Sequence, residues 1–217
     1  MFKSMGAATR VLIFINVLVY LGQVSSNGAL TDLLYYSPMS TFTEPWRMIT
    51  SGFAHSDQLF TNPMSVLHIG LNMYTLAILG NLLEPMLGAR RFVILYLLSI
   101  FGGSVLVLLV GNPIGGVLGA SGGIFGLMGA FFVVLRTLGG NANSIVGVIA
   151  INLVFTFLNS GISWQAHIGG LIVGAGVAFL YSRTRSSAKT QLQNWGLAGI
   201  LVLLLAISFV RATTLLG

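Results

Sequence analysis

Seven long apolar runs constrain this chain more than any other feature of its sequence. A helix needs about 20 apolar residues to cross the hydrocarbon core of a bilayer, with a working range of about 17 to 25. Only 6% of the 217 residues are charged, whereas a soluble domain carries about 25%. The runs are continuous and do not alternate with polar residues, which argues against a transmembrane β-barrel. We therefore expect an all-α integral membrane protein, with helices at about 11–24, 64–87, 92–110, 117–135, 144–159, 165–182 and 195–210.

Lys and Arg outnumber Asp and Glu by ten to four, which gives a net charge of +6. In a soluble protein this excess would suggest nucleic acid, but here the basic residues gather at the ends of apolar runs, where they set membrane orientation. We expect no nucleic-acid partner. The positive-inside rule predicts a multi-pass protein of the cell (plasma) membrane with a cytoplasmic N-terminus, because only Arg47 and Arg211 then fall outside. The inner loops receive Lys3, Arg10, Arg90, Arg91, Arg136, Arg183, Arg185 and Lys189.

The runs also suggest how the chain is divided. The first run could be the apolar region of a signal peptide, but no small-x-small cleavage site convincingly follows it, and we favour an uncleaved anchor. Residues 25–63 form a long outer connection rich in aromatic residues, which we expect to lie at the membrane surface, partly embedded in the interface. The expected organisation is a six-helix core at 1–182 that includes this loop, a polar linker at 183–194 and an additional C-terminal transmembrane helix at 195–211.

Polar and ionisable residues inside the runs are few, and each is a candidate functional residue. His68, Ser121 and His167 each fall within the first turn or two of a helix that runs inward from the outer side. Three polar groups from three helices therefore share one depth, just below the outer surface. Asn72 lies one turn after His68, and Glu84 falls at the opposite, inner end.

Small residues spaced four apart indicate which helices touch. Gly115, Gly119 and Gly123 repeat at this spacing, as do Gly122 with Gly126, and Ala166 with Gly170 and Gly174. Such faces let helix backbones approach closely. His167 shares a face with Gly170 and Gly174, so it points toward the neighbour. If the fourth and sixth helices pair, His167 can reach Ser121. Ordinary membrane packing is the alternative explanation for these glycines.

The residues after Ser121 limit the chemistry that this serine can perform. The sequence Gly119-Ala120-Ser121-Gly122-Gly123 matches the nucleophile elbow of α/β-hydrolases. No Asp or Glu follows Ser121, however, so a triad in that order is impossible. A Ser–His pair remains, with His167 as the base that activates the hydroxyl.

Other membrane-enzyme chemistries fail on residue identity. A zinc metalloprotease needs H-E-x-x-H, but this chain has His68-Ile69-Gly70-Leu71-Asn72. A two-aspartate mechanism needs acids within the spans, whereas Asp32 and Asp57 lie in the long loop. There are no cysteines, so thiolate metal sites and disulfides are excluded. No metal site is expected.

His68 and Asn72, at positions i and i+4, share one helix face. Their useful role beside a nucleophile is hydrogen bonding to a developing oxyanion, together with the backbone N–H of Ser121. An ordinary structural hydrogen bond between helices is the alternative reading of this pair.

Taken together, these residues resemble the rhomboid intramembrane serine proteases. The resemblance rests on Gly119-x-Ser121-Gly122, on Ala166-His167-x-x-Gly170-x-x-x-Gly174, on His68-x-x-x-Asn72 and on Trp46-Arg47 in the long loop. It implies a rhomboid-like bundle of six transmembrane helices, with the seventh resembling the extra C-terminal span of some members. It further implies Ser121 as nucleophile, His167 as general base, and His68 and Asn72 as oxyanion donors.

The resemblance also implies structural residues. Glu84, in Leu83-Glu84-Pro85-x-x-Gly88, is similar to the family's structural acid at the inner end of the second helix. The position four after the serine, often tyrosine in the family, is Phe125, whose ring can pack on His167 but cannot hydrogen-bond. The structural positions that the resemblance implies are Trp46, Arg47, Glu84, Gly119, Gly122, Phe125, Gly170 and Gly174.

The expected function is hydrolysis of peptide bonds in or near transmembrane helices of other membrane proteins, at a site that opens to the outer side and needs no cofactor. The alternative is an inactive rhomboid-like protein that binds or displaces client helices. A transporter is a weaker interpretation, because only Glu84 offers a charge within the spans. Substrate identity and oligomeric state stay open.

Overall fold

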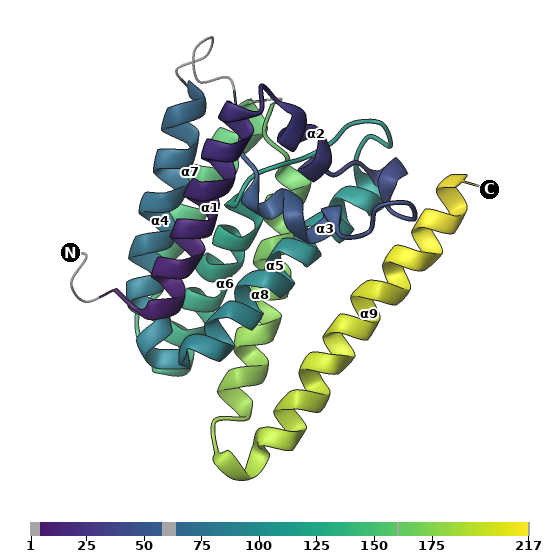
Figure 1. Cartoon of the computed structure of the whole chain (residues 1–217). Coiled ribbons are helices and arrows are strands. Elements are labelled where there is room, and N and C mark those ends of the chain that lie inside the picture. The colour runs from purple at the N-terminus through teal and green to yellow at the C-terminus, as the bar shows by residue number, and fades with distance from the viewer. Residues whose placement is uncertain (1–4, 58–63, 160, 217) are drawn as a thin grey trace.

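The computed structural model describes residues 5–57, 64–159 and 161–216, and the regular elements in these ranges are helices. The seven long helices coincide with the seven apolar runs, which confirms the predicted all-α bundle (Figure 1). They are α1 (Ala7–Ser25), α4 (Met64–Leu87), α5 (Ala89–Val110), α6 (Ser121–Thr137), α7 (Asn143–Leu158), α8 (Trp164–Arg183) and α9 (Thr190–Leu216).

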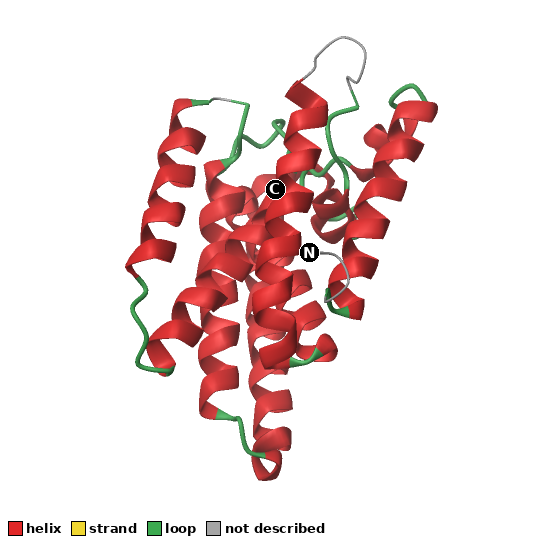
Figure 2. Ribbon diagram, turned by 90° about the vertical axis from the view of Figure 1, so that its left-hand side faces the viewer, coloured by secondary structure: helices red, strands yellow, loops and turns green. Residues whose placement is uncertain are grey.

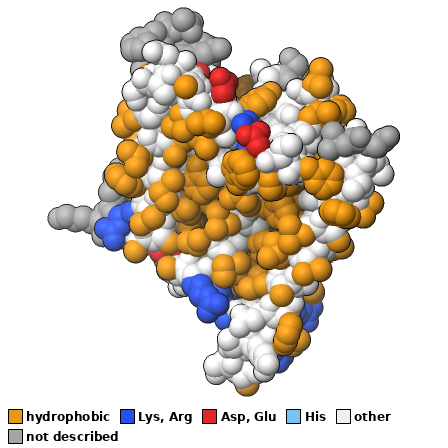
Figure 3. Space-filling view, turned by 45° about the vertical axis from the view of Figure 1, so that its right-hand side comes forward, with side chains coloured by type: hydrophobic (Ala, Val, Ile, Leu, Met, Phe, Trp, Pro, Cys, Tyr) orange, Lys and Arg blue, Asp and Glu red, His pale blue; other side chains and the backbone are white. Residues whose placement is uncertain are grey.

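Membrane-spanning potential differs among these helices. Five of them, α1, α4, α5, α8 and α9, are long and apolar enough to cross a bilayer, while α6 and α7 are apolar but shorter. Figure 3 shows apolar side chains covering the middle of one face, with Lys and Arg gathered toward its lower end. Because apolar side chains cover the surface that lipid would contact, the chain is a multi-pass membrane protein.

The long loop is folded over the described residues 26–57. It contains α2 (Ala29–Leu34), α3 (Arg47–Thr50) and two 3₁₀ turns at Pro38–Ser40 and Ser51–Phe53. Met48 of α3 is buried against α5, where the Ser104 hydroxyl donates to its carbonyl oxygen at 2.7 Å. The loop therefore packs on the helix bundle at one end. Residues 58–63 of the expected loop lie outside the described residues.

The helix expected at 117–135 begins later than predicted, at Ser121. Gly119 has a φ of +128°, which is incompatible with a right-handed helix. Gly115 and Gly119 consequently lie outside α6, so the predicted helical repeat of Gly115, Gly119 and Gly123 is wrong.

The last helix is longer than expected. It begins at Thr190 and takes in the second half of the segment predicted as a polar linker, 183–194. Gln193, near its start, is buried and donates to both the carbonyl oxygen and the hydroxyl of Thr184. These hydrogen bonds satisfy the side-chain amide of the buried Gln193, which lets the helix include this polar residue.

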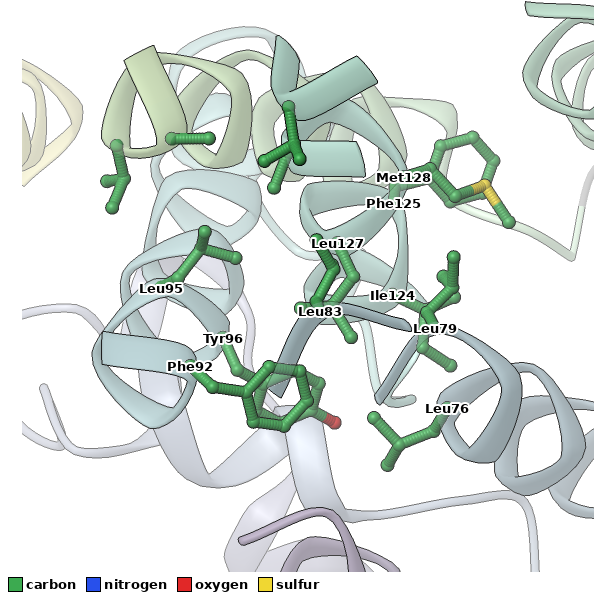
Figure 4. Packing of buried hydrophobic residues seen from close by; sticks show 14 of the residues in the cluster. Leu76, Leu79, Leu83, Phe92, Leu95, Tyr96, Ile124, Phe125, Leu127 and Met128 are labelled. Atoms are coloured by element: carbon green, nitrogen blue, oxygen red, sulfur yellow. The ribbon is translucent and has the colours of Figure 1, made fainter. Parts of the chain in front are cut away.

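The core lies between α4, α5 and α6 (Figure 4). Leu76 and Leu83 of α4, Phe92 of α5 and Leu127 of α6 are fully buried there, and Leu79, Leu95, Tyr96, Ile124, Phe125 and Met128 complete the view. These large side chains fill the space between the three helices, whose backbones are too far apart to touch. The opposite side of α6, facing α8, is packed in a different way.

Helices α6 and α8 meet backbone to backbone. A Cβ atom placed on Gly170 would lie 2.0 Å from the Gly122 carbonyl oxygen, and one on Gly174 would lie 2.2 Å from that of Gly126. Real side chains cannot approach a carbonyl oxygen so closely, so glycine is required on this face. The predicted pairing of the fourth and sixth apolar runs is confirmed.

Candidate active site

Ser121 is the first residue of α6, and the segment before it is anchored to the long loop. Val117 and Tyr36 exchange backbone hydrogen bonds at 2.8 and 3.1 Å, and the Gly119 N–H donates to the Ser51 carbonyl oxygen at 2.9 Å. Gly119 then turns the chain into the helix. The serine is thus held at a fixed point, at a helix start whose first N–H groups have no acceptor within the helix.

His167 stands in the first turn of α8, which begins after Ser163. The Ser163 hydroxyl accepts a hydrogen bond from the Ala166 N–H at 3.2 Å and caps the helix. The close α6–α8 approach brings the His167 Nε2 atom to 2.8 Å from the Ser121 Oγ atom. The two residues lie 46 positions apart in the chain, yet they form a direct hydrogen bond.

The imidazole ring of His167 is held on two further sides. Phe125 of α6 stacks on it with ring centroids 4.1 Å apart and planes 14° apart. The Nδ1 atom lies 2.8 Å from the Thr156 hydroxyl of α7. Stacking fixes the plane of the ring and the two hydrogen bonds fix its rotation within that plane, so the ring is preorganised toward the serine.

A cavity of about 270 Å³ lies in front of Ser121, and His68 of α4 and Gly119 line it. A Cβ atom at Gly119 would lie 3.5 Å from the His68 ring and 3.7 Å from Ser121 Oγ. The His68 ring and the Ser121 hydroxyl therefore lie close to each other, on either side of Gly119. Asn72 is buried but does not line this cavity, because its side-chain amide donates to the His68 carbonyl oxygen at 2.9 Å. The structure therefore places His68 at the cavity beside Ser121, whereas the Asn72 side chain lies outside the cavity lining.

The four carboxylates of the chain are engaged away from this pair. Glu44 pairs with Arg47 at 2.6 Å, and Asp57 accepts a hydrogen bond from Thr31 at 2.7 Å. Asp32 stands on α2 and Glu84 lies at the far end of α4. Within the described ranges no carboxylate contacts His167, so the arrangement is a serine–histidine pair without an acid.

Arg47 organises the loop beside the cavity. Its guanidinium donates to the carbonyl oxygens of Asp32 and Tyr35, at 2.6 and 2.9 Å, as well as to Glu44. Trp46, the other loop residue predicted to be structural, is 55% exposed. Arg47 therefore joins two parts of the loop, whereas the Trp46 ring has no aromatic stacking or hydrogen bond with another residue that the structure describes.

Glu84 is buried at the opposite end of the bundle, where it receives the start of α1. Its carboxylate accepts hydrogen bonds from the N–H groups of Ala8 and Thr9, at 2.9 and 2.8 Å, and from the Thr9 hydroxyl at 2.6 Å. A carboxylate at a helix N-terminus satisfies free N–H groups and favours the helix dipole. Glu84 thus fastens α1 to α4.

Comparison with known proteins identifies the family of this chain. Residues 43–184, well over half of the chain, match the rhomboid domain. The chain belongs to the rhomboid family. The match runs from Thr43, just before α3, to the end of α8, and leaves α1, α2 and α9 of this rhomboid outside.

Curated relatives of this rhomboid come from plants and bacteria. RHOMBOID-like protein 6, mitochondrial, of Arabidopsis thaliana is 32% identical over 186 residues, 81% of this chain and 56% of the relative. Rhomboid protease GluP of Bacillus subtilis (strain 168) is 33% identical over 174 residues, 76% of this chain and 31% of the relative. Rhomboid protease GlpG of Yersinia pseudotuberculosis serotype I (strain IP32953) is 30% identical over 159 residues, 70% of this chain and 52% of the relative. This rhomboid therefore spans between about a third and somewhat over half of the length of these relatives.

Sequence reasoning missed two residues, one in contact with His167 and one beside His68. Thr156 carries no sequence signal that separates it from other threonines in apolar helices. His55 lies in the loop and is fully buried, with its ring edge-on to Tyr20 and to His68 at 6.5 and 5.8 Å between centroids. Gln23 of α1 holds the His55 backbone on both sides, donating to its carbonyl oxygen at 2.7 Å and accepting from its N–H at 2.8 Å.

The environment of His55 keeps it uncharged. Burial is the main cause that lowers the pKa of His55 to about 3, and the neighbouring His68 lowers it further, while a hydrogen bond to the Phe53 backbone opposes the shift. A neutral ring fits this fully buried position. A histidine outside the apolar runs could have been noticed in the sequence, but its burial could not.

Proposed function

We propose that this rhomboid is a serine endopeptidase that hydrolyses peptide bonds in or near transmembrane helices of membrane-protein substrates. The observation that carries the proposal is the 2.8 Å hydrogen bond between Ser121 Oγ and His167 Nε2, which lies at the edge of a cavity. A serine hydroxyl becomes a nucleophile when an adjacent base takes its proton. Relatives named rhomboid proteases support the same reaction class.

Acylation begins when His167 Nε2 accepts the hydroxyl proton while Ser121 Oγ forms a bond to the substrate carbonyl carbon. The carbonyl oxygen becomes an oxyanion. His167 then gives the proton to the leaving nitrogen, the C–N bond breaks, and an amine product departs from the acyl-enzyme.

Oxyanion stabilisation falls to groups that flank the serine. The Ser121 N–H and the His68 ring are the proposed donors, because both adjoin the cavity. Asn72 would join them only after its amide turns away from the His68 carbonyl oxygen. Removal of one such donor costs about 10² to 10³ in rate in a well-studied serine protease.

Deacylation uses water and the same base. His167 takes a proton from a water molecule as that water attacks the acyl carbon, and it returns the proton to Ser121 Oγ as the ester bond breaks. The cycle balances with water alone. In the proposed orientation the N-terminus is cytoplasmic and the cavity opens to the outer side of the plasma membrane, where water is available.

Cleavage of a transmembrane test substrate by purified protein in lipid vesicles tests the proposal. We expect Ser121→Ala and His167→Ala to reduce turnover below detection, since the nucleophile or its base is removed. Ser182→Ala is the matched control, because the hydroxyl of this half-buried serine of α8 donates to the Phe179 carbonyl oxygen, away from the candidate site. A fluorophosphonate should label the wild type and the control but not Ser121→Ala.

Two outcomes would overturn the assignment. Cleavage that persists in Ser121→Ala would place the nucleophile elsewhere. A folded wild type that neither cleaves nor reacts with the probe would favour the alternative of a rhomboid that binds client helices without hydrolysing them.

A further inference from the structure

The Thr156 hydroxyl stands between two acceptor-capable atoms. Its Oγ1 atom lies 2.8 Å from the Asn152 carbonyl oxygen, one turn earlier on α7, and 2.8 Å from His167 Nδ1. A hydroxyl has one hydrogen to donate. A carbonyl oxygen can only accept, so the contact with Asn152 uses that hydrogen. The contact with His167 can then be a hydrogen bond only if Nδ1 carries the proton.

From this geometry we infer that Thr156 is a positioning residue for the proposed reaction, holding neutral His167 in the tautomer with its hydrogen on Nδ1. The inference rests on the proposed function, and it adds a third residue, from a third helix, to the serine–histidine pair. With the hydrogen on Nδ1, the Nε2 atom has a free lone pair directed at Ser121. That lone pair is what a general base requires.

The opposite tautomer is disfavoured by the same atoms. With the hydrogen on Nε2, the bare Nδ1 would face the Thr156 oxygen, whose hydrogen is already given to Asn152. Two lone pairs would then meet in a site where Thr156 is 3% and His167 6% exposed. A buried polar atom without a partner is costly, so burial strengthens the tautomer preference.

The position of Thr156 links the base to α7. Only Ile145 and Thr156 among the side chains of α7 are buried, and Figure 2 shows this helix at the left edge of the bundle. Thr156 also lines a second cavity of about 460 Å³, together with Asn159 and Gln165. A displacement of α7 of about 1 Å would lengthen the contact beyond hydrogen-bond range. The tautomer of His167 therefore depends on where α7 lies.

Three variants test the role of the hydroxyl. Thr156→Val keeps the shape of the side chain and removes the acceptor, whereas Thr156→Ser keeps the acceptor. Thr75→Val is the matched control, because Thr75 also donates to the carbonyl oxygen four residues earlier, at 2.8 Å, and its hydroxyl has no hydrogen bond to a histidine among the described residues. We expect Thr156→Val to lower kcat about 10- to 100-fold, by analogy with the loss seen when the hydrogen-bond partner of a metal-bound imidazole is removed. KM should change less than about twofold, and Thr156→Ser and Thr75→Val should stay near the wild type.

A spectroscopic measurement tests the tautomer without relying on turnover. The chain has three histidines, so ¹⁵N-histidine spectra are simple, and the His167 signals are those lost in His167→Asn. We expect a hydrogen on Nδ1 in the wild type, in Thr156→Ser and in Thr75→Val, and a mixture or the opposite tautomer in Thr156→Val.

The outcomes separate this inference from the proposed function. A wild-type His167 with its hydrogen on Nε2 overturns the inference even if Thr156→Val fails to fold. Wild-type kcat together with an unchanged tautomer in Thr156→Val also overturns it, and leaves the serine protease proposal standing. An Nδ1 hydrogen in a wild type without Ser121-dependent turnover supports the positioning role and contradicts the proposed function.

Discussion

Two glycines of α8, only two residues apart, should respond very differently to the same substitution. A Cβ atom on Gly174 would lie 2.2 Å from the Gly126 carbonyl oxygen, whereas one on Gly176 would meet nothing within 4 Å. We expect Gly174→Val to lower the free energy of unfolding by about 1 to 3 kcal/mol, the usual cost of overpacking. Thermal unfolding in detergent measures the loss. Gly176→Val should match the wild type, and an equal effect of both would contradict the close approach.

His55 should make stability depend on pH. Its pKa is lowered to about 3 in the folded protein, against about 6.5 in an unfolded chain. Between these values the unfolded state binds more protons, so the free energy of unfolding falls as pH falls. From about pH 7 to about pH 5 the loss amounts to roughly 2 kcal/mol, because one pKa unit corresponds to about 1.4 kcal/mol.

The variant His55→Gln isolates this contribution, since it keeps the backbone contacts with Gln23 and removes the titrating ring. Its unfolding temperature should decline less over the same pH interval than that of the wild type. Parallel pH profiles for the two proteins would show that His55 does not carry the effect, whatever the variant's absolute stability.

The positions of the individual site residues were predictable only in part from the sequence. Chain order and helix direction placed Ser121 and His167 at one depth, and glycine spacing predicted that their helices touch. The same reasoning missed Thr156. The sequence does not distinguish a helical threonine that also contacts a histidine from one that only donates a hydrogen bond to its own helix. The i, i+4 spacing of His68 and Asn72 predicted that the two side chains share a helix face. It did not predict that the Asn72 amide would donate to the His68 carbonyl oxygen.

Among the elements, α1 depends on a single distant carboxylate. Glu84 accepts three hydrogen bonds from Ala8 and Thr9, and Glu84→Gln leaves at least one of them without an acceptor. Hydrogen bonds to charged groups contribute about 1.5 to 3 kcal/mol, so we expect a loss of that order and faster hydrogen exchange in the first turns of α1.

Glu44→Gln provides the control for this measurement. Glu44 also pairs at short distance, with Arg47, but in the loop and near solvent, where ion pairs contribute about 0 to 1 kcal/mol. Unchanged exchange at the start of α1 in Glu84→Gln would show that the helix is held by its other contacts.

Apolar runs predicted the long helices because membrane spans are determined by length and hydropathy. They did not predict where α6 begins, since the turn at Gly119 depends on the Tyr36–Val117 bridge and the Ser51 carbonyl oxygen, both contributed by the distant loop. The short helices α2 and α3 escaped prediction for a related reason. Helix α3 packs on the bundle through the buried Met48, and Thr31 of α2 forms hydrogen bonds with Gln23 and Asp57. A local sequence pattern contains neither kind of contact.

At the scale of the whole molecule, α9 is the helix whose removal we expect to be tolerated. It packs on α5 near Phe101 and Val105, and most of its side chains face outward. Lipid can cover the surface that its loss exposes, because lipid tails are as apolar as the side chains of α9. A chain ending after Lys189 should keep fluorophosphonate labelling at Ser121 and unfold at a lower temperature.

The same truncation carrying Ser121→Ala is the control for labelling. Loss of labelling in an otherwise folded truncated protein would mean that α9 belongs to the working core. The division into a six-helix core and an additional helix therefore stays a proposal that this measurement decides.

The shortness of the Ser121–His167 contact has a consequence for energised membranes. In the proposed transfer the proton moves by less than the 2.8 Å that separates Oγ from Nε2, and 2.8 Å is about a tenth of a hydrocarbon core of ~30 Å. A full elementary charge gains about 2.3 kcal/mol per 100 mV across the whole bilayer, so this proton gains at most about 0.2 kcal/mol. That corresponds to a rate change of about 1.4-fold. A cell that collapsed its transmembrane voltage would leave this chemistry almost untouched.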